Sequence, residues 1–165
     1  TRIKPALLAC TLLALSACTT YRDIPPNSSI SQVESQLGSP NYRCTLADGR
    51  QRLVWSQQPL GQYAYGTNVN KDGHIDNVPS PLTASHFRRL NEGRWTQNDV
   101  ACEFGPPAEI DRVDLGEKNE VVWTYRYRQS NAWNSLMFVY FGRDGEAVTH
   151  YHSGPDLRYE RWWND

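Results

Sequence analysis

The chain contains one short design twice, SSISQVESQLGSP at residues 28–40 and WTQNDVACEFGPP at residues 95–107. Each copy begins with a hydroxyl residue suited to a helix N-cap and has a capping-box partner three residues later. Apolar residues then recur at helical spacing, and glycine followed by proline ends the pattern. The paired positions are Ser29 and Thr96, Gln32 and Asp99, Val33 and Val100, Leu37 and Phe104, and Gly38 and Gly105. The sequence therefore predicts two short helices, 67 residues apart.

A strand centred on tryptophan is predicted after each helix, RLVWS at 52–56 and EVVWTYRY at 120–127. In the second strand, apolar and aromatic residues alternate with more polar ones, which is typical of a half-buried antiparallel strand. A third segment follows in each copy, QYAYGTNV at 62–69 and SLMFVYFG at 135–142. Each copy then reaches an Asp-Gly pair, which favours a turn with positive φ, and an apolar residue. The pairs are Asp72-Gly73 and Asp144-Gly145, followed by Ile75 and Val148.

The repeated unit is therefore helix, strand, strand, Asp-Gly turn and strand. This order predicts an α+β fold of two tandem helix-plus-antiparallel-sheet units, with strands sharing a sheet or lying side by side and helices on one face. We expect the first unit at 29–80, a connecting helix at 81–94, and the second unit at 95–165 with an aromatic C-terminal tail.

The N-terminal segment has the composition of an export signal. Two basic residues precede the apolar run ALLACTLLAL at 6–15, which is too short to span a bilayer. LSAC at 15–18 matches the lipobox of bacterial lipoproteins, so we expect residues 1–17 to be a signal peptide and Cys18 to carry lipid. Residues 18–28 would then be the lipidated N-terminus and its tether. The alternative is an ordinary secretory signal with an incidental cysteine.

The pattern Val33-x3-Leu37-Gly38-x-Pro40, a tryptophan strand, QPLGQYAYG at 58–66 and Asp-Gly resembles the BamE/SmpA/OmlA family of outer-membrane lipoproteins. The duplication is similar in layout to the β-lactamase inhibitor protein superfamily. The resemblance extends from about Ser29 to about His152 and implies an outer-membrane, lipid-anchored domain that faces the periplasm. It also implies an envelope protein partner, such as the barrel-assembly machinery or another outer-membrane complex. BamE itself has a single copy, so its specific partners do not transfer.

The remaining cysteines, Cys44 and Cys102, form an even pair in an oxidising compartment, which predicts a disulfide; two buried free thiols are the alternative. The chain has 17 Lys and Arg against 18 Asp and Glu, a net charge of −1. This balance gives no electrostatic basis for binding nucleic acid.

No metal, cofactor or catalytic site is expected. TNVNKDGHIDN at 67–77 resembles a calcium loop, but Pro79 stands where an EF-hand requires glutamate, and the second copy keeps only Asp-Gly. His150 and His152 share a strand face without a third ligand in sequence. No serine or thiol has a positioned base, and DRVDLGEKNE at 111–120 is interpreted as a solvated loop.

Aromatic residues are the feature most open to a functional interpretation, because six Trp and nine Tyr exceed what two small cores require. Trp, Tyr and Arg are enriched at interface hot spots; the alternative is that the C-terminal tail packs back over the sheet. The candidate partner-binding residues are Trp133, Tyr159, Arg161, Trp162 and Trp163. We predict a non-catalytic binding or scaffolding lipoprotein of outer-membrane protein assembly or envelope integrity. The alternative is a periplasmic inhibitor of an enzyme such as a β-lactamase or lysozyme.

Overall fold

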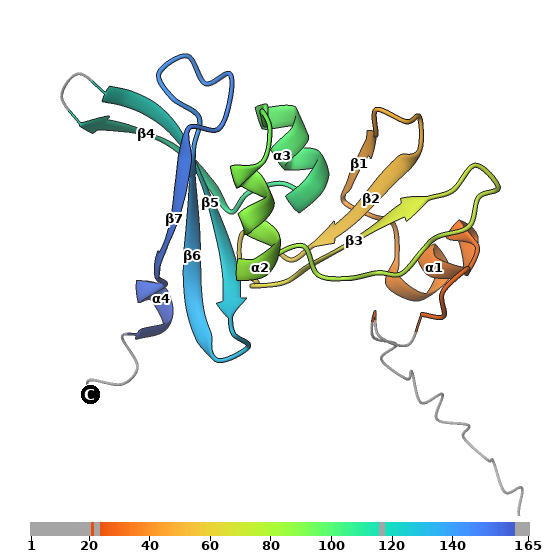
Figure 1. The fold of residues 1–165 in the computed structure, drawn as a ribbon. Helices are drawn as coiled ribbons and strands as arrows, with labels where there is room; N and C mark the ends of the chain where they lie inside the picture. Colours follow the sequence, from red (N-terminus) through yellow and green to blue (C-terminus); the bar gives the residue numbers. More distant parts are fainter. Residues whose placement is uncertain (1–20, 22–23, 116–117, 161–165) are drawn as a thin grey trace, which may run out of the picture.

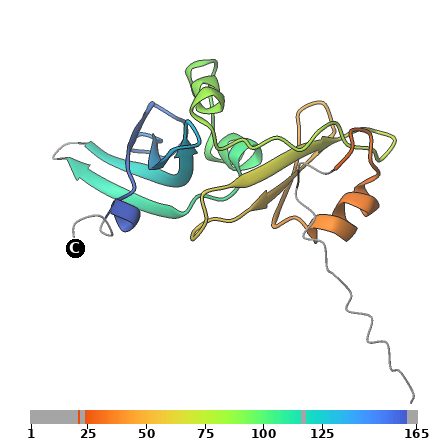
Figure 2. The same ribbon diagram turned by 90° about the horizontal axis from the view of Figure 1, so that it is seen from below.

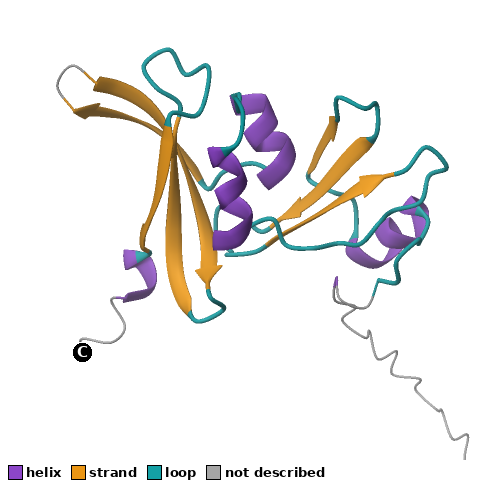
Figure 3. Ribbon diagram, in the orientation of Figure 1, coloured by secondary structure: helices purple, strands orange, loops and turns teal. Residues whose placement is uncertain are grey.

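The computed structural model describes residue 21 and residues 24–115 and 118–160, which form helices and two antiparallel sheets (Figures 1 and 3). The first sheet has the order β1-β2-β3 and the second the order β4-β5-β6-β7. The strands are β1 (Tyr42–Thr45), β2 (Gln51–Ser56), β3 (Ala64–Val69), β4 (Glu109–Leu115), β5 (Lys118–Gln129), β6 (Trp133–Tyr140) and β7 (His150–Pro155). The helices are α1 (Ile30–Leu37), α2 (Ala84–Phe87), the 3-10 helix η2 (Arg88–Asn91), α3 (Gln97–Phe104) and α4 (Leu157–Glu160). The predicted α+β class is confirmed.

The elements stack in layers, with α1 on one side of the first sheet and α2 and α3 between the two sheets (Figures 1 and 2). The expected arrangement, with strands in a common sheet or side by side and helices on one face, is therefore wrong. The reason lies in β2, where successive side chains point to opposite faces and both faces are apolar. Leu53 and Trp55 pack in the cluster with Val33 of α1, whereas Val54 packs in the cluster with Val100 of α3.

Two hydrophobic cores result. The larger core lies between the sheets and contains Val54, Ala64, Leu82, Phe87, Leu90, Val100, Ala101, Phe104, Val121, Trp123, Tyr125, Tyr127, Met137, Val139 and Phe141. The smaller core lies under α1 and contains Ile24, Val33, Leu53, Trp55, Val69, Ile75 and Val78. Of the tryptophans and tyrosines, Trp123, Tyr125 and Tyr127 are buried in the larger core and Trp55 in the smaller one.

Both predicted helices begin at the predicted caps. Ser29 Oγ accepts a hydrogen bond from Gln32 N at 3.3 Å. At α3 the capping box is reciprocal, because Thr96 Oγ1 accepts from Asp99 N and the Asp99 carboxylate accepts from Thr96 N. Both helices end at a glycine with positive φ, 77° at Gly38 and 84° at Gly105.

Three segments differ from the sequence expectations. Residues 111–115 and 118–120 do not form a loop but belong to the paired strands β4 and β5, because backbone pairing overrides their polar composition. The connecting segment at 81–94 is two short pieces, α2 and η2. After the first Asp-Gly turn the chain makes isolated bridges at His74 and Ile75, whereas the second copy continues into β7. No helix in the described part of the chain is long and apolar enough to cross a bilayer.

Candidate functional site

Two of the sequence-predicted binding residues belong to elements at one end of the molecule, Trp133 to the start of β6 and Tyr159 to α4, which follows β7 (Figure 1). Trp133 opens β6 with 72% of its surface exposed. Tyr159, in α4, is half-buried, and its hydroxyl donates to the carbonyl of Leu60 at 3.1 Å. Arg161, Trp162 and Trp163 lie outside the described residues, as does the predicted lipidation site Cys18.

The loop between β2 and β3, residues 57–63, reaches across to the second unit. Gln58 binds both backbone groups of Arg126: its Nε2 donates to the Arg126 carbonyl at 2.8 Å, and its Oε1 accepts from Arg126 N at 3.1 Å. Arg126 Nε in turn donates to the carbonyl of Pro59 at 2.9 Å. The pairing of β4 with β5 ends at Thr124. Beyond it, the Gln58 side chain makes the hydrogen bonds to the β5 backbone that a neighbouring strand would make.

An ion pair between Arg126 and Asp156 fastens the start of α4 to this junction. The Asp156 side chain is only 2% exposed and that of Arg126 12%. Asp156 N also donates to the carbonyl of Asn134 at 3.1 Å. Breaking a buried pair leaves one uncompensated charge, so these contacts hold the loop, β5 and α4 in one arrangement.

Large apolar side chains project into solvent from the segments that these contacts join. Leu60 is 70% exposed and Leu157 is 62% exposed, in addition to Trp133. We call Leu60, Trp133, Leu157 and Tyr159 the junction surface. Sequence reasoning found Trp133 and Tyr159 but missed the two leucines, because no periodic pattern distinguishes an exposed loop leucine from a core leucine.

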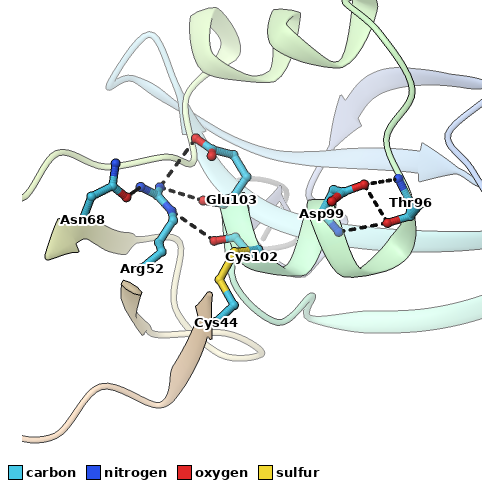
Figure 4. Close-up of a disulfide and its surroundings, with 7 residues drawn as sticks. All are labelled: Cys44, Arg52, Asn68, Thr96, Asp99, Cys102 and Glu103. Carbon is cyan, nitrogen blue, oxygen red and sulfur yellow. Dashed lines mark hydrogen bonds and ion pairs between the residues drawn. A yellow bond between two sulfur atoms is a disulfide. The ribbon is translucent and has the colours of Figure 1, made fainter. Parts of the chain in front are cut away.

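The predicted cysteines form a disulfide, Cys44–Cys102, that joins β1 to α3 (Figure 4). Arg52 lies opposite Cys44 on β2 and caps the end of the same helix. Its guanidinium donates to the carbonyls of Cys102 at 3.0 Å and Glu103 at 2.9 Å, and to Asn68 Oδ1 at 3.0 Å. Gly66 leaves space for this guanidinium, since a Cβ there would lie 2.8 Å from Arg52 Nη2.

Glu103 is the buried acid at the centre of this cluster, with its side chain 12% exposed. Its Oε1 accepts from His86 Nε2 at 2.5 Å and from Arg89 Nη1 at 2.6 Å. Burial alone raises the pKa of Glu103, but the His86 hydrogen bond and the charges of Arg52 and Arg89 outweigh burial and hold the pKa below its ordinary value. The bonds of Glu103 with Arg52, His86 and Arg89 tie the connecting segment and β2 to α3.

In both sequence motifs considered as metal sites, the side chains make contacts within the protein. At the first Asp-Gly turn, Asn70 Nδ2 donates to Asp76 Oδ1 at 3.2 Å, and Gly73 has φ of 81°. On the second sheet, the ring of His150 stacks on Tyr140 and His152 Nε2 lies 2.9 Å from the Tyr140 hydroxyl. In residue 21 and residues 24–115 and 118–160, no three His, Cys, Asp or Glu side chains are grouped as a metal site requires.

Two solved structures are similar to this chain at low identity. A DUF4309 family protein (YjgB) from Bacillus subtilis matches with 18% identity and a TM-score of 0.31, over 78% of this chain and 79% of that one. A candidate beta-lactamase inhibitor protein from Streptococcus mutans matches with 14% identity and a TM-score of 0.33, over 84% of this chain and 89% of that one. No family model matches the chain, and no curated protein does. The resemblance to the BamE family therefore stays a prediction.

Proposed function

We propose that this protein is a non-catalytic binding module of the cell envelope that holds a partner protein through the junction surface. The observation that carries the proposal is the exposure of Leu60, Trp133 and Leu157, each above 60%, on segments that the contacts of Gln58, Arg126 and Asp156 join. Exposed apolar groups that are already ordered lose little entropy when a partner covers them. Tyr159 adds a side-chain type that is frequent at binding hot spots.

The disulfide supports an envelope location for this activity. Bonds such as Cys44–Cys102 persist in oxidising compartments and are rare in the cytosol. Together with the export signal and the lipobox at Cys18, this favours a lipid-anchored protein whose folded part faces the periplasm. An accessory role in outer-membrane protein assembly or envelope integrity is the specific form that we propose.

Inhibition of a periplasmic enzyme is the second candidate, and the 57–63 loop is the observation that favours it. Gln58 and Pro59 bind Arg126, and the Leu60 carbonyl accepts from Tyr159, while the Leu60 side chain stays exposed. Hydrogen bonds thus hold this loop on both sides of an exposed side chain. Such a loop is preorganised to enter the active-site cleft of an enzyme.

Site-specific photocrosslinking in intact cells tests the proposal. A photoreactive residue at position 60, 133 or 157 should capture one partner, whereas the same residue at Ile110, 59% exposed on β4, should not. Trp133→Ala should reduce the capture from position 60 at least tenfold. Barrel-assembly components or another membrane complex in the product would support the scaffold, and a single soluble hydrolase in stoichiometric amount would support the inhibitor. Equal capture from Ile110 would contradict a role for the junction surface.

A further inference from the structure

A cleft of about 490 Å³ lies between the first unit and the β5–β6 turn, separate from the four residues of the junction surface. Three tyrosines, Tyr21, Tyr63 and Tyr65, line one part of it. Arg128 and Asn131 line it from the second unit, and the segment between the units contributes Ser80, Leu82 and Thr83. Its volume is within the range of small-molecule sites.

The tyrosine rings form a nearly parallel series. Tyr63 immediately precedes β3 and Tyr65 lies two residues later within it, a spacing that places extended-chain side chains on the same side. Their ring centroids are 6.3 Å apart and their planes differ by 7°. Tyr21 stacks on Tyr65 with centroids 3.6 Å apart. Tyr63 ends the series and is 36% exposed, so it is the ring most available to a ligand.

The second unit contributes a fixed polar wall. Arg128 Nη1 donates to Asn134 Oδ1 at 2.7 Å, and its Nη2 donates to the carbonyl of Asn131 at 3.0 Å, which holds the guanidinium flat against the turn. Asn131 is exposed and has a left-handed backbone, with φ of 56°. Its side-chain amide can both donate and accept hydrogen bonds. The Thr83 hydroxyl already caps α2 by accepting from His86 N at 3.1 Å, and the Ser80 hydroxyl is buried.

We propose that this cleft binds a neutral sugar ring of a glycan. A pyranose has an apolar C–H face, which suits a tyrosine face, and a rim of hydroxyls that donate and accept hydrogen bonds, as the Asn131 amide does. A proline-rich peptide presents backbone carbonyl groups, which accept hydrogen bonds, along its length. A site for such a peptide therefore needs mainly hydrogen-bond donors. A phosphate would call for several cationic side chains, whereas Arg128 is the only Lys, Arg or His among the described residues that line the cleft, and each of its Nη groups already makes a hydrogen bond within the protein.

Isothermal titration of the full-length protein with neutral tetrasaccharides of glucose and of N-acetylglucosamine tests this site. At least one should bind saturably, and Tyr63→Ala should weaken that binding at least tenfold. Tyr63→Phe should retain most of it, because the ring face is kept. Tyr140→Ala is the control: this tyrosine is half-buried and lies at the far end of β6, next to His150, and its replacement should leave the affinity unchanged.

Saturable binding of neither tetrasaccharide would overturn the proposal, as would binding that survives Tyr63→Ala. Binding of a proline-rich peptide in place of the sugars would also overturn it and would assign the cleft to peptide recognition. Crosslinking through position 133 reports on the junction surface separately, and Tyr63→Ala should leave it intact. The two proposals can therefore fail independently.

Discussion

Cys44 and Arg52 face each other on paired strands, and both bind Cys102 of α3, one through a disulfide and the other through a hydrogen bond of 3.0 Å. Two unrelated kinds of bond thus fix the same helix to the same place on the first sheet. Because α3 also packs against the second sheet, this attachment and the Gln58–Arg126 contacts together set the position of the two units relative to each other.

Removing the disulfide should destabilise the protein strongly. The bond closes a sequence separation of 58 residues, for which loop-closure entropy predicts a loss of about 4 kcal/mol. The double variant Cys44→Ala/Cys102→Ala should therefore unfold at lower urea concentration than the oxidised protein. A midpoint equal to that of the oxidised protein would show that Arg52 and the cores hold α3 without it.

Glu103→Gln should destabilise the protein by about 3 kcal/mol at pH 7, because it leaves Arg52 and Arg89 beside a neutral group. The pKa of Glu103 is held below its ordinary 4.5 in the folded state, so its stabilisation is present above that value and is lost as the pH falls through the folded pKa. Urea unfolding between pH 7 and pH 3 measures this.

The difference between wild type and Glu103→Gln should accordingly shrink in acid. Glu146→Gln is the control: its ion pair with Arg94 is exposed on both sides, and the change should cost less than about 0.5 kcal/mol at pH 7. A difference for Glu103→Gln that stays constant down to pH 3 would contradict the assigned direction of the pKa.

The two core tryptophans should respond differently to replacement by phenylalanine. Trp55 Nε1 donates to the carbonyl of Gly38 at 2.8 Å, whereas Trp123 Nε1 is buried without a hydrogen-bond partner in the described part of the chain. Both substitutions remove similar apolar volume, but only Trp55→Phe also leaves a carbonyl without its donor. We expect its free energy of unfolding to fall by about 1 kcal/mol more than that of Trp123→Phe, measured in urea. Equal losses of unfolding free energy would argue against a stabilising hydrogen bond between Trp55 Nε1 and the Gly38 carbonyl.

The glycines that end α1 and α3 should also differ. Both have φ near 80° and ψ close to 180°, a region essentially restricted to glycine, so alanine should cost about 1–3 kcal/mol at either position. At Gly38 an added Cβ has no atom within 4 Å, but at Gly105 it would lie 2.9 Å from Val54 Cγ1. Thermal unfolding should therefore show the larger loss of stability for Gly105→Ala. A larger loss for Gly38→Ala would contradict the close contact between position 105 and Val54.

The sequence by itself determined the helix and the tryptophan strand of each copy. Caps such as Ser29 and Thr96, the stop glycines and the alternation in β5 are local patterns, and local backbone physics was enough to predict both helices and the tryptophan strands. The same local patterns predicted the aromatic candidates Trp133 and Tyr159, although Arg161, Trp162, Trp163 and Cys18 lie outside the described residues.

Only the tertiary structure decided how the two units are arranged and which residues meet. No local signal states that α3 packs between two sheets, that Gln58 binds Arg126, or that Leu60 is exposed beside Tyr159. The polar residues 111–115 and 118–120 lie in strands for the same reason, because pairing between β4 and β5 supplied hydrogen bonds that their composition did not predict. Contacts between residues far apart in sequence depend on the packing of whole elements, and one-dimensional periodicity does not contain that information.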